Sequence, residues 1–234
     1  EAGAPAALSG VMCRLIKGNR GLFQPEDLTA VLRPANVHFP RTKLLVMENT
    51  HNRGGGTVWP IEQIAAIAET ARNAGLKMHL DGARLWNASA KTGISEKEYA
   101  SHFDTISVCF SKGLGAPVGS ALAGSAEVID RARRFRKMFG GGMRQAGIIA
   151  AGAIFAMDNN RQKLALDHEN AKKLASELAK IEGIELDIDS VETNMVFFNT
   201  KFPADKFAEA MKEKNLLILP VGPNRLRAVT NLAV

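Results

Sequence analysis

Three polar side chains stand where apolar runs typical of β-strands end, and each of them could take part in catalysis. Asp81, Lys112 and His51 each lie within two residues of the end of such a run. In a parallel sheet, the C-terminal ends of the strands border one crevice. A single strand-end aspartate is more often a helix cap or an ion-pair partner, and a single lysine is usually solvated. The combination of the three is what predicts a catalytic site.

The surroundings of Lys112 indicate what chemistry its amine could do. Ser111 precedes it, and Gly-Leu-Gly follows at residues 113–115. Because glycine has no side chain, it lets a planar ligand approach the backbone closely. Pyridoxal phosphate is such a ligand, and it needs a lysine for its Schiff base and an acid beside its pyridine nitrogen. Asp81 can be that acid, through a charge-assisted hydrogen bond worth about 1.5 to 3 kcal/mol.

The elements that must position these residues alternate between strands and helices. An apolar run at 44–49 precedes a helix whose apolar face includes Ile61, Ile64 and Ala68, and strands follow at 76–80 and 105–110. This alternation predicts an α/β fold with a mainly parallel sheet and helices on both faces.

The pattern changes after Arg144. The periodicity there predicts helices and short strands in an α+β arrangement. We expect helices at 147–157, 161–180 and 202–215, and strands at 183–187, 194–199, 216–220 and 226–230. We therefore predict a large domain at 1–159 and a small C-terminal domain at 160–234, with the boundary at Asn159–Asn160.

Composition excludes several other classes of protein. The 234 residues carry 30 Lys plus Arg against 24 Asp plus Glu, and 46% are hydrophobic, which is typical of a globular protein. No apolar stretch approaches the ~18 residues of a membrane span. Cys13 and Cys109 have no partner at metal-ligand or disulfide-framework spacing, so we expect a cytoplasmic protein without a metal site. The basic run at 131–137 has one aromatic residue, and a solvated or subunit-facing helix is favoured over nucleic-acid binding.

Four segments together resemble the low-specificity L-threonine aldolases, which are pyridoxal-phosphate enzymes of the aspartate aminotransferase fold type (fold type I). The segments are ENTHN at 48–52, HLDGAR at 79–84, SKGLGAPVGS at 111–120 and RKMFGGGMRQ at 136–145. RAVTN at 227–231 resembles the arginine-containing strand of the family's small domain. The resemblance implies the pyridoxal-phosphate-dependent transferase fold, with a small C-terminal α+β domain.

The resemblance also implies a role for each matching residue. Lys112 would bind the cofactor covalently, Asp81 would pair with its pyridinium nitrogen, and Arg84 would contact the ring oxygen or nearby substrate groups. Arg227 would hold the substrate carboxylate. His38 matches a family histidine near the substrate hydroxyl, where it could accept the hydroxyl proton.

Two further basic residues match positions close to the cofactor phosphate. Lys137 and Arg144 flank Gly140-Gly-Gly142, and the neighbouring subunit contributes some of these positions in the family. The resemblance therefore implies a homodimer or a homotetramer. It also leads us to expect that the family's N-terminal segment, with its phosphate-binding turn, and its terminal helix lie outside these 234 residues. Asn231 stands where the family usually has histidine.

The expected reaction is the cleavage of L-threonine or L-allo-threonine to glycine and acetaldehyde. A β-eliminating lyase that acts on an aromatic amino acid would use the same lysine and aspartate, so motifs alone do not separate the two enzymes. A noncatalytic dimerisation fragment is the alternative from another class of protein. Neither a nucleic acid nor a membrane is expected as a partner.

Overall fold

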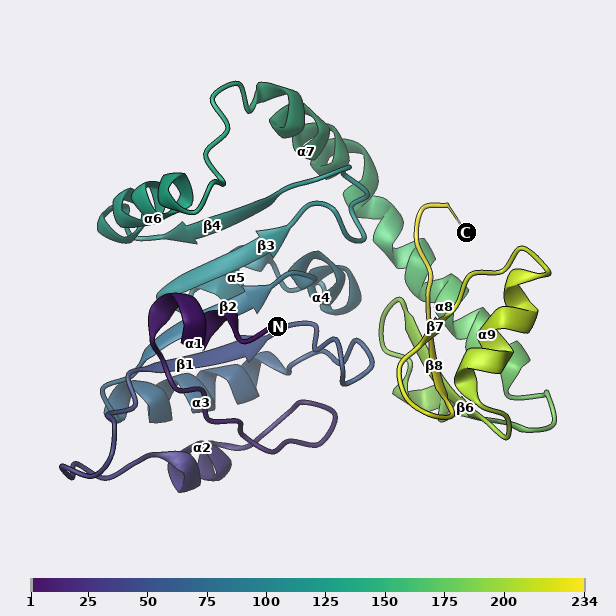
Figure 1. Ribbon diagram of the computed structural model, residues 1–234, viewed down its shortest axis with the longest axis horizontal. Coiled ribbons are helices and arrows are strands. Elements are labelled where there is room, and N and C mark those ends of the chain that lie inside the picture. The colour runs from purple at the N-terminus through teal and green to yellow at the C-terminus, as the bar shows by residue number, and fades with distance from the viewer. Residues whose placement is uncertain (1, 234) are drawn as a thin grey trace.

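The computed structural model describes residues 2–233 and contains two separate sheets (Figure 1). The first has the strand order β1-β2-β3-β4, in which β1, β2 and β3 are parallel and β4 is antiparallel to β3. Its strands are β1 (Leu44–Glu48), β2 (Lys77–Gly82), β3 (Thr105–Cys109) and β4 (Ser120–Gly124). The mainly parallel sheet predicted from the sequence is confirmed.

The second sheet is antiparallel, with the strand order β5-β6-β8-β7. Its strands are β5 (Ile184–Glu185), β6 (Met195–Thr200), β7 (Leu219–Pro220) and β8 (Arg225–Val229). The α-helices of the described chain are α1 (Ala4–Ser9), α2 (Pro25–Val31), α3 (Ile61–Asn73), α4 (Leu85–Thr92), α5 (Glu96–Ala100), α6 (Ala126–Met138), α7 (Gly147–Asn160), α8 (Leu164–Leu178) and α9 (Ala204–Lys212).

The core of the first sheet lies on the face that α3 covers. Leu45 and Met47 of β1 are buried there, together with Ile64 and Ile67 of α3. Side chains alternate between the two faces of a strand, and Val46 on the other face is about half exposed. The face away from α3 is therefore the more open one.

The second core packs α8 and α9 against one face of the antiparallel sheet. Ala171 and Ala175 of α8 contact a cluster that includes Phe198 of β6 and Leu226 of β8. Small alanine side chains let the helix approach the sheet closely. The alternate positions, such as Phe197 and Arg227, lie on the opposite face of the sheet.

A continuous helical segment joins the two sheets (Figure 1). Helix α7, the short 3-10 helix η1 (Arg161–Lys163) and α8 follow one another, and a third core cluster of Leu114, Ala116, Ala156 and Leu164 forms at this joint. The second core draws its residues from α8 onwards. We therefore propose that the large and the small domain meet at Asn159–Asn160.

Several elements differ from the sequence prediction. The strands expected at 183–187 and 216–220 are reduced to β5 and β7, with two residues each, and α1, α2, α4 and α5 were not predicted. The helix expected at 161–180 is divided into η1 and α8. Strand β4 was not predicted, because Ser-Ala-Leu-Ala-Gly has little β-propensity and every one of its residues is exposed. None of the described helices is long and apolar enough to cross a membrane.

Candidate active site

The C-terminal edge of the parallel strands collects the polar residues that the sequence predicted. Glu48 of β1, Asp81 of β2 and Ser107 of β3 are register partners, so their side chains point to the same face of the sheet. That face is the one away from α3. The parallel strand order thus brings two carboxylates together at one edge of the sheet. We call this edge, with the side chains that reach it, the crevice.

Asp81 is held by the turn that follows β2. Its Oδ1 accepts a hydrogen bond from the backbone N–H of Ala83 at 3.1 Å. A Cβ at Gly82 would lie 2.8 Å from the carbonyl oxygen of Ser107, so only glycine fits between β2 and β3 at this point. The carboxylate of Asp81 consequently has a fixed place at the sheet edge.

Arg84 lies directly before α4 and brings a partly buried positive charge to the crevice. Burial lowers the pKa of its guanidinium, Glu48 and Asp81 oppose that shift, and Arg227 adds to it. An arginine remains protonated in proteins near neutral pH. Two carboxylates and two guanidiniums therefore act on one another at this edge.

Arg227 reaches the same crevice from β8 of the second sheet. Its Nη1 donates a hydrogen bond to Oδ1 of Asn52 at 2.9 Å. Its Nε is buried and has no hydrogen-bond partner among residues 2–233. A buried donor without a partner costs about 1 to 3 kcal/mol. The unsatisfied Nε is therefore suited to an acceptor supplied by a ligand, such as a carboxylate.

Lys112 follows β3 by three residues at the same edge of the sheet. Its side chain is exposed, and its amine makes no hydrogen bond or ion pair with the described part of the chain. The backbone turns immediately after it, with the N–H of Gly115 donating to the carbonyl of Lys112 at 2.8 Å. Gly115 has a φ of +73°, in the left-handed region that favours glycine. The amine is therefore unpaired and accessible to a ligand.

His51 lies at the edge, but one of its ring nitrogens is already engaged by the backbone. Its Nδ1 accepts the backbone N–H of Gly54 at 2.9 Å. The ring proton is thereby assigned to Nε2, which faces Oε2 of Glu48 at 3.8 Å. A Cβ at Gly21 would overlap the ring, so the imidazole is packed tightly from that side. His51 supports the loop after β1.

Three predicted site residues lie away from this crevice. His38 is exposed in the segment between α2 and β1, six residues before β1 begins, whereas the crevice is at the other end of that strand. Figure 1 shows that segment extending from the far end of the sheet. Lys137 of α6 and Arg144 in the α6–α7 segment are exposed and make no hydrogen bond or ion pair with the crevice side chains.

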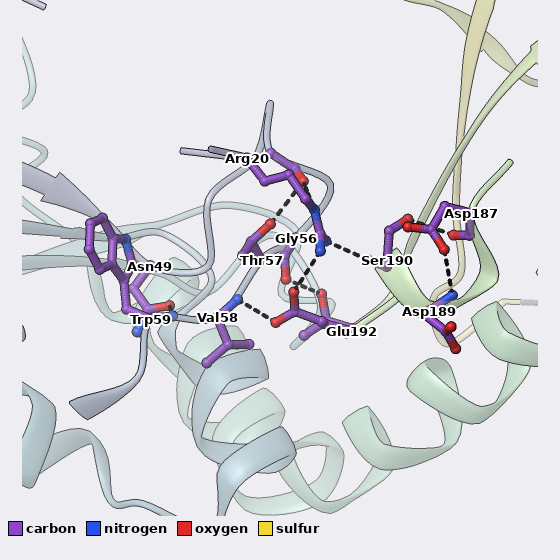
Figure 2. A network of polar contacts seen from close by, with 12 residues as sticks. Arg20, Asn49, Gly56, Thr57, Val58, Trp59, Asp187, Asp189, Ser190 and Glu192 are labelled. Carbon is purple, nitrogen blue, oxygen red and sulfur yellow. Dashed lines mark hydrogen bonds and ion pairs between the residues drawn. The ribbon is translucent and has the colours of Figure 1, made fainter. Parts of the chain in front are cut away.

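A polar network ties the loop after β1 to the second sheet (Figure 2). Arg20 Nη1 forms an ion pair with Glu192 Oε1 at 3.1 Å, and Glu192 Oε2 accepts the N–H of Val58 at 2.9 Å. Thr193 Oγ1 donates to the carbonyl of Gly56 at 2.9 Å. Asn52 lies in the loop after β1, and Arg227 lies on β8 of the second sheet. Because the network joins that loop to that sheet, it fixes the position of Asn52 relative to Arg227.

The sequence analysis did not find Arg20 or Glu192. They are far apart in the chain and belong to no local motif, so only the folded structure reveals the pair. A groove of about 460 Å³ borders this network on the side of Phe197 and Arg225. None of the residues predicted to bind cofactor or substrate lines it, so the groove is not the candidate active site.

The chemistry of the crevice fits pyridoxal phosphate and an amino acid. The free amine of Lys112 and the carboxylate of Asp81 are the groups that the cofactor requires, and the unsatisfied Nε of Arg227 is available to a carboxylate. No group of three or more His, Cys, Asp or Glu side chains suited to a metal occurs among residues 2–233. The crevice is thus equipped for a carbonyl cofactor and an amino-acid substrate.

Comparisons with known proteins agree with this chemistry. The family model described as Beta-eliminating lyase matches residues 1–201. The low specificity L-threonine aldolase of Escherichia coli K12 is 41% identical over 238 aligned positions, which cover 100% of this chain and 68% of that protein. The chain spans between about half and two thirds of the length of these curated relatives, with 66% for two proteins of Arabidopsis thaliana and 52% for the low specificity L-threonine aldolase of Saccharomyces cerevisiae.

Solved structures share the fold. Threonine aldolase from Leishmania major has a TM-score of 0.74 at 22% identity, covering 93% of this chain and 64% of that one. Aspartate aminotransferase from Thermotoga maritima has a TM-score of 0.63 at 17% identity, covering 89% of this chain and 56% of that one. The fold class predicted from the sequence is confirmed.

Proposed function

Because the chain belongs to the beta-eliminating lyase family, together with the low-specificity L-threonine aldolases, we propose that it cleaves L-threonine or L-allo-threonine to glycine and acetaldehyde. The observation that carries the proposal is the meeting of Asp81 of β2 and Arg84, two residues after β2, with Arg227 of the second sheet. The buried, unpartnered Nε of Arg227 supports an amino-acid carboxylate as the missing partner.

Each crevice residue has a distinct task in this proposal. Lys112 holds pyridoxal phosphate through its amine, and Asp81 keeps a positive charge at the ring nitrogen. When bound, the cofactor supplies an electron sink for breaking the bond between Cα and Cβ. Arg84 contacts the ring oxygen or nearby substrate groups, where its charge is balanced by Glu48 and Asp81.

Arg227 determines which substrate bond is broken. A planar guanidinium can grip a carboxylate with two parallel hydrogen bonds. Its Nη1 is engaged by Asn52, which leaves Nε and the remaining N–H groups for the substrate. Fixing the carboxylate fixes the rotation about Cα, and so orients the bond to Cβ for cleavage.

The residues outside the crevice suggest a homo-oligomer, either a dimer or a tetramer. Lys137 and Arg144 are exposed and make no hydrogen bond or ion pair with the crevice side chains, so they would serve the cofactor phosphate of a neighbouring subunit. His38 lies before the opposite end of β1 and would likewise accept the hydroxyl proton of substrate bound to a neighbouring subunit.

Product analysis with a lysine variant tests the proposal. The full chain with pyridoxal phosphate should convert L-threonine to equal amounts of glycine and acetaldehyde. Lys112→Ala should lose at least about 100-fold of this activity, because no other amine takes its place. Lys97→Ala, at an exposed position on α5, is the matched control and should keep full activity.

Two results would contradict the proposal. Undiminished cleavage by Lys112→Ala would remove the lysine from the reaction. Release of 2-oxobutanoate and ammonia in place of glycine and acetaldehyde would indicate an eliminating lyase.

A further inference from the structure

The reach of the Lys112 amine depends on the backbone of residues 111–115. Its exposed side chain has no partner in the described chain, so nothing but the backbone positions it. Two backbone hydrogen bonds shape the loop that follows β3. The N–H of Gly115 donates to the carbonyl of Lys112, and the N–H of Ala116 donates to the carbonyl of Phe110. Contacts that fix the backbone of this loop therefore also fix the position of the Lys112 amine.

Asn160, the last residue of α7, forms a direct hydrogen bond with this loop. Its Nδ2 donates to the carbonyl of Leu114 at 2.9 Å, and its Oδ1 accepts a hydrogen bond from Nζ of Lys163 at 3.1 Å. The side chain is buried, with 8% of the residue exposed. Because Lys163 can only donate, it selects the amide orientation in which Nδ2 faces Leu114.

The glycines beside Lys112 are packed closely, Gly113 against α8 and α4 and Gly115 against the segment after β8. A Cβ at Gly113 would lie 2.7 Å from Leu164 and 3.2 Å from Oδ1 of Asn87, and a Cβ at Gly115 would lie 2.7 Å from Leu232. The loop therefore has no room to shift toward α8. Asn160 provides the hydrogen bond that keeps it from moving away.

We propose that Asn160 is a positioning residue that fixes the Lys112 loop and thereby the reach of its amine toward the cofactor. The inference rests on the proposed function, since it assigns Lys112 to pyridoxal phosphate. It adds that α7 and η1, at the joint between the two sheets, determine where the reactive amine stands.

The test compares two neighbouring asparagines. Asn160→Asp replaces the donor with a carboxylate oxygen that faces the carbonyl of Leu114. Asn159→Asp makes the same change in charge at an exposed residue whose amide bonds only to its own helix. Asn160→Ala removes the donor without adding charge. It replaces Asn160→Asp in the test if the aspartate variant does not fold.

Two measurements are made on the full chain. Trypsin cleavage after Lys112, without cofactor, reports the order of the loop and should be several-fold faster in the Asn160 variants. The apparent Kd for pyridoxal phosphate, with the fraction fixed to Lys112 by borohydride, should show binding weakened by about tenfold. The KM for L-threonine at saturating cofactor should change much less, because Asn160 does not contact Arg227.

The outcomes separate the inference from the proposed function. Wild-type cleavage or wild-type cofactor binding in the Asn160 variants would overturn the inference, as would an equal effect of Asn159→Asp. A wild-type chain without any borohydride-fixed adduct would contradict the proposed function, and trypsin cleavage would then still decide whether Asn160 holds the loop.

Discussion

Arg84 and Arg227 approach one another although both carry a positive charge. Burial lowers the pKa of Arg84 most, the charge of Arg227 lowers it further, and the carboxylates of Glu48 and Asp81 oppose both effects. An anion bound between the two guanidiniums would relieve their repulsion further. At the scale of single residues, the crevice is therefore built to gain stability from a bound carboxylate.

Arg227→Lys should weaken substrate binding although it keeps the charge. A lysine ammonium cannot reproduce the planar, two-point grip, so the KM for L-threonine should rise by about 10- to 100-fold. Arg225→Lys, two residues earlier on β8, is the matched control, because Arg225 is exposed and lies over the ring of Phe197. Steady-state kinetics of acetaldehyde formation measure both. An unchanged KM for Arg227→Lys would move the carboxylate site to Arg84.

Sequence motifs led us to the candidate site residues that belong to local patterns, and the structure shows where those patterns lie. Asp81 lies near the end of β2, Arg84 and Lys112 follow β2 and β3, and the parallel order of these strands brings the three segments to one edge. The unsatisfied Nε of Arg227 depends on the placement of two sheets, and no spacing in the sequence encodes it. Similarly, the motif that contains His38 does not show that a strand separates it from the crevice.

At the scale of elements, the loop after β1 is the piece that connects the two sheets. Gly56 has a φ of +77°, and a Cβ there would lie 2.3 Å from Oγ1 of Thr193. Thr193 donates to the carbonyl of this same glycine. The loop can approach the second sheet so closely because this position has no side chain.

Gly56→Ala should destabilise the protein more than Gly75→Ala. Both residues have a positive φ, which costs an alanine about 1 kcal/mol, but nothing lies within 4 Å of a Cβ at Gly75. The overlap with Thr193 should add about 1 to 3 kcal/mol for Gly56. Urea unfolding of the two variants measures the difference. Equal losses would show that the loop can move away from the second sheet without cost.

At the scale of the whole molecule, a buried histidine links the two halves of the chain. His168 of α8 and Asn87 of α4 are both buried, and His168 Nε2 lies 3.0 Å from Asn87 Nδ2. Burial, with the charges of Lys91 and Lys172, lowers the pKa of His168 to about 4. The native structure therefore holds this imidazole in its neutral form near neutral pH.

The stability of the protein should fall as the pH drops from about 6.5 toward 4. In that window the unfolded chain binds a proton at His168 that the folded chain does not, which favours unfolding. Between pH 7 and pH 5 this group should remove about 2 kcal/mol from the free energy of unfolding. His168→Gln keeps a polar group beside Asn87 but does not titrate. Between pH 7 and pH 5, the free energy of unfolding of this variant should therefore fall by about 2 kcal/mol less than that of the wild type. Urea unfolding at both pH values tests this, and parallel profiles would contradict it.

The Arg20–Glu192 network also sets an order of events during synthesis of the chain. The N–H of Val58 donates to the carboxylate of Glu192, which is synthesised 134 residues later. Arg20 donates to the carbonyl of Ser190, 170 residues away. Closing such long loops is slow, because entropy must be lost before the contacts form. The parallel strands β1 to β3 can pair while the second sheet is still emerging from the ribosome. Because Glu192 and Arg227 are synthesised after β1 to β3, the crevice can be completed only once the second sheet has formed. Protection of the Val58 amide from hydrogen exchange should therefore report that the two sheets have come together.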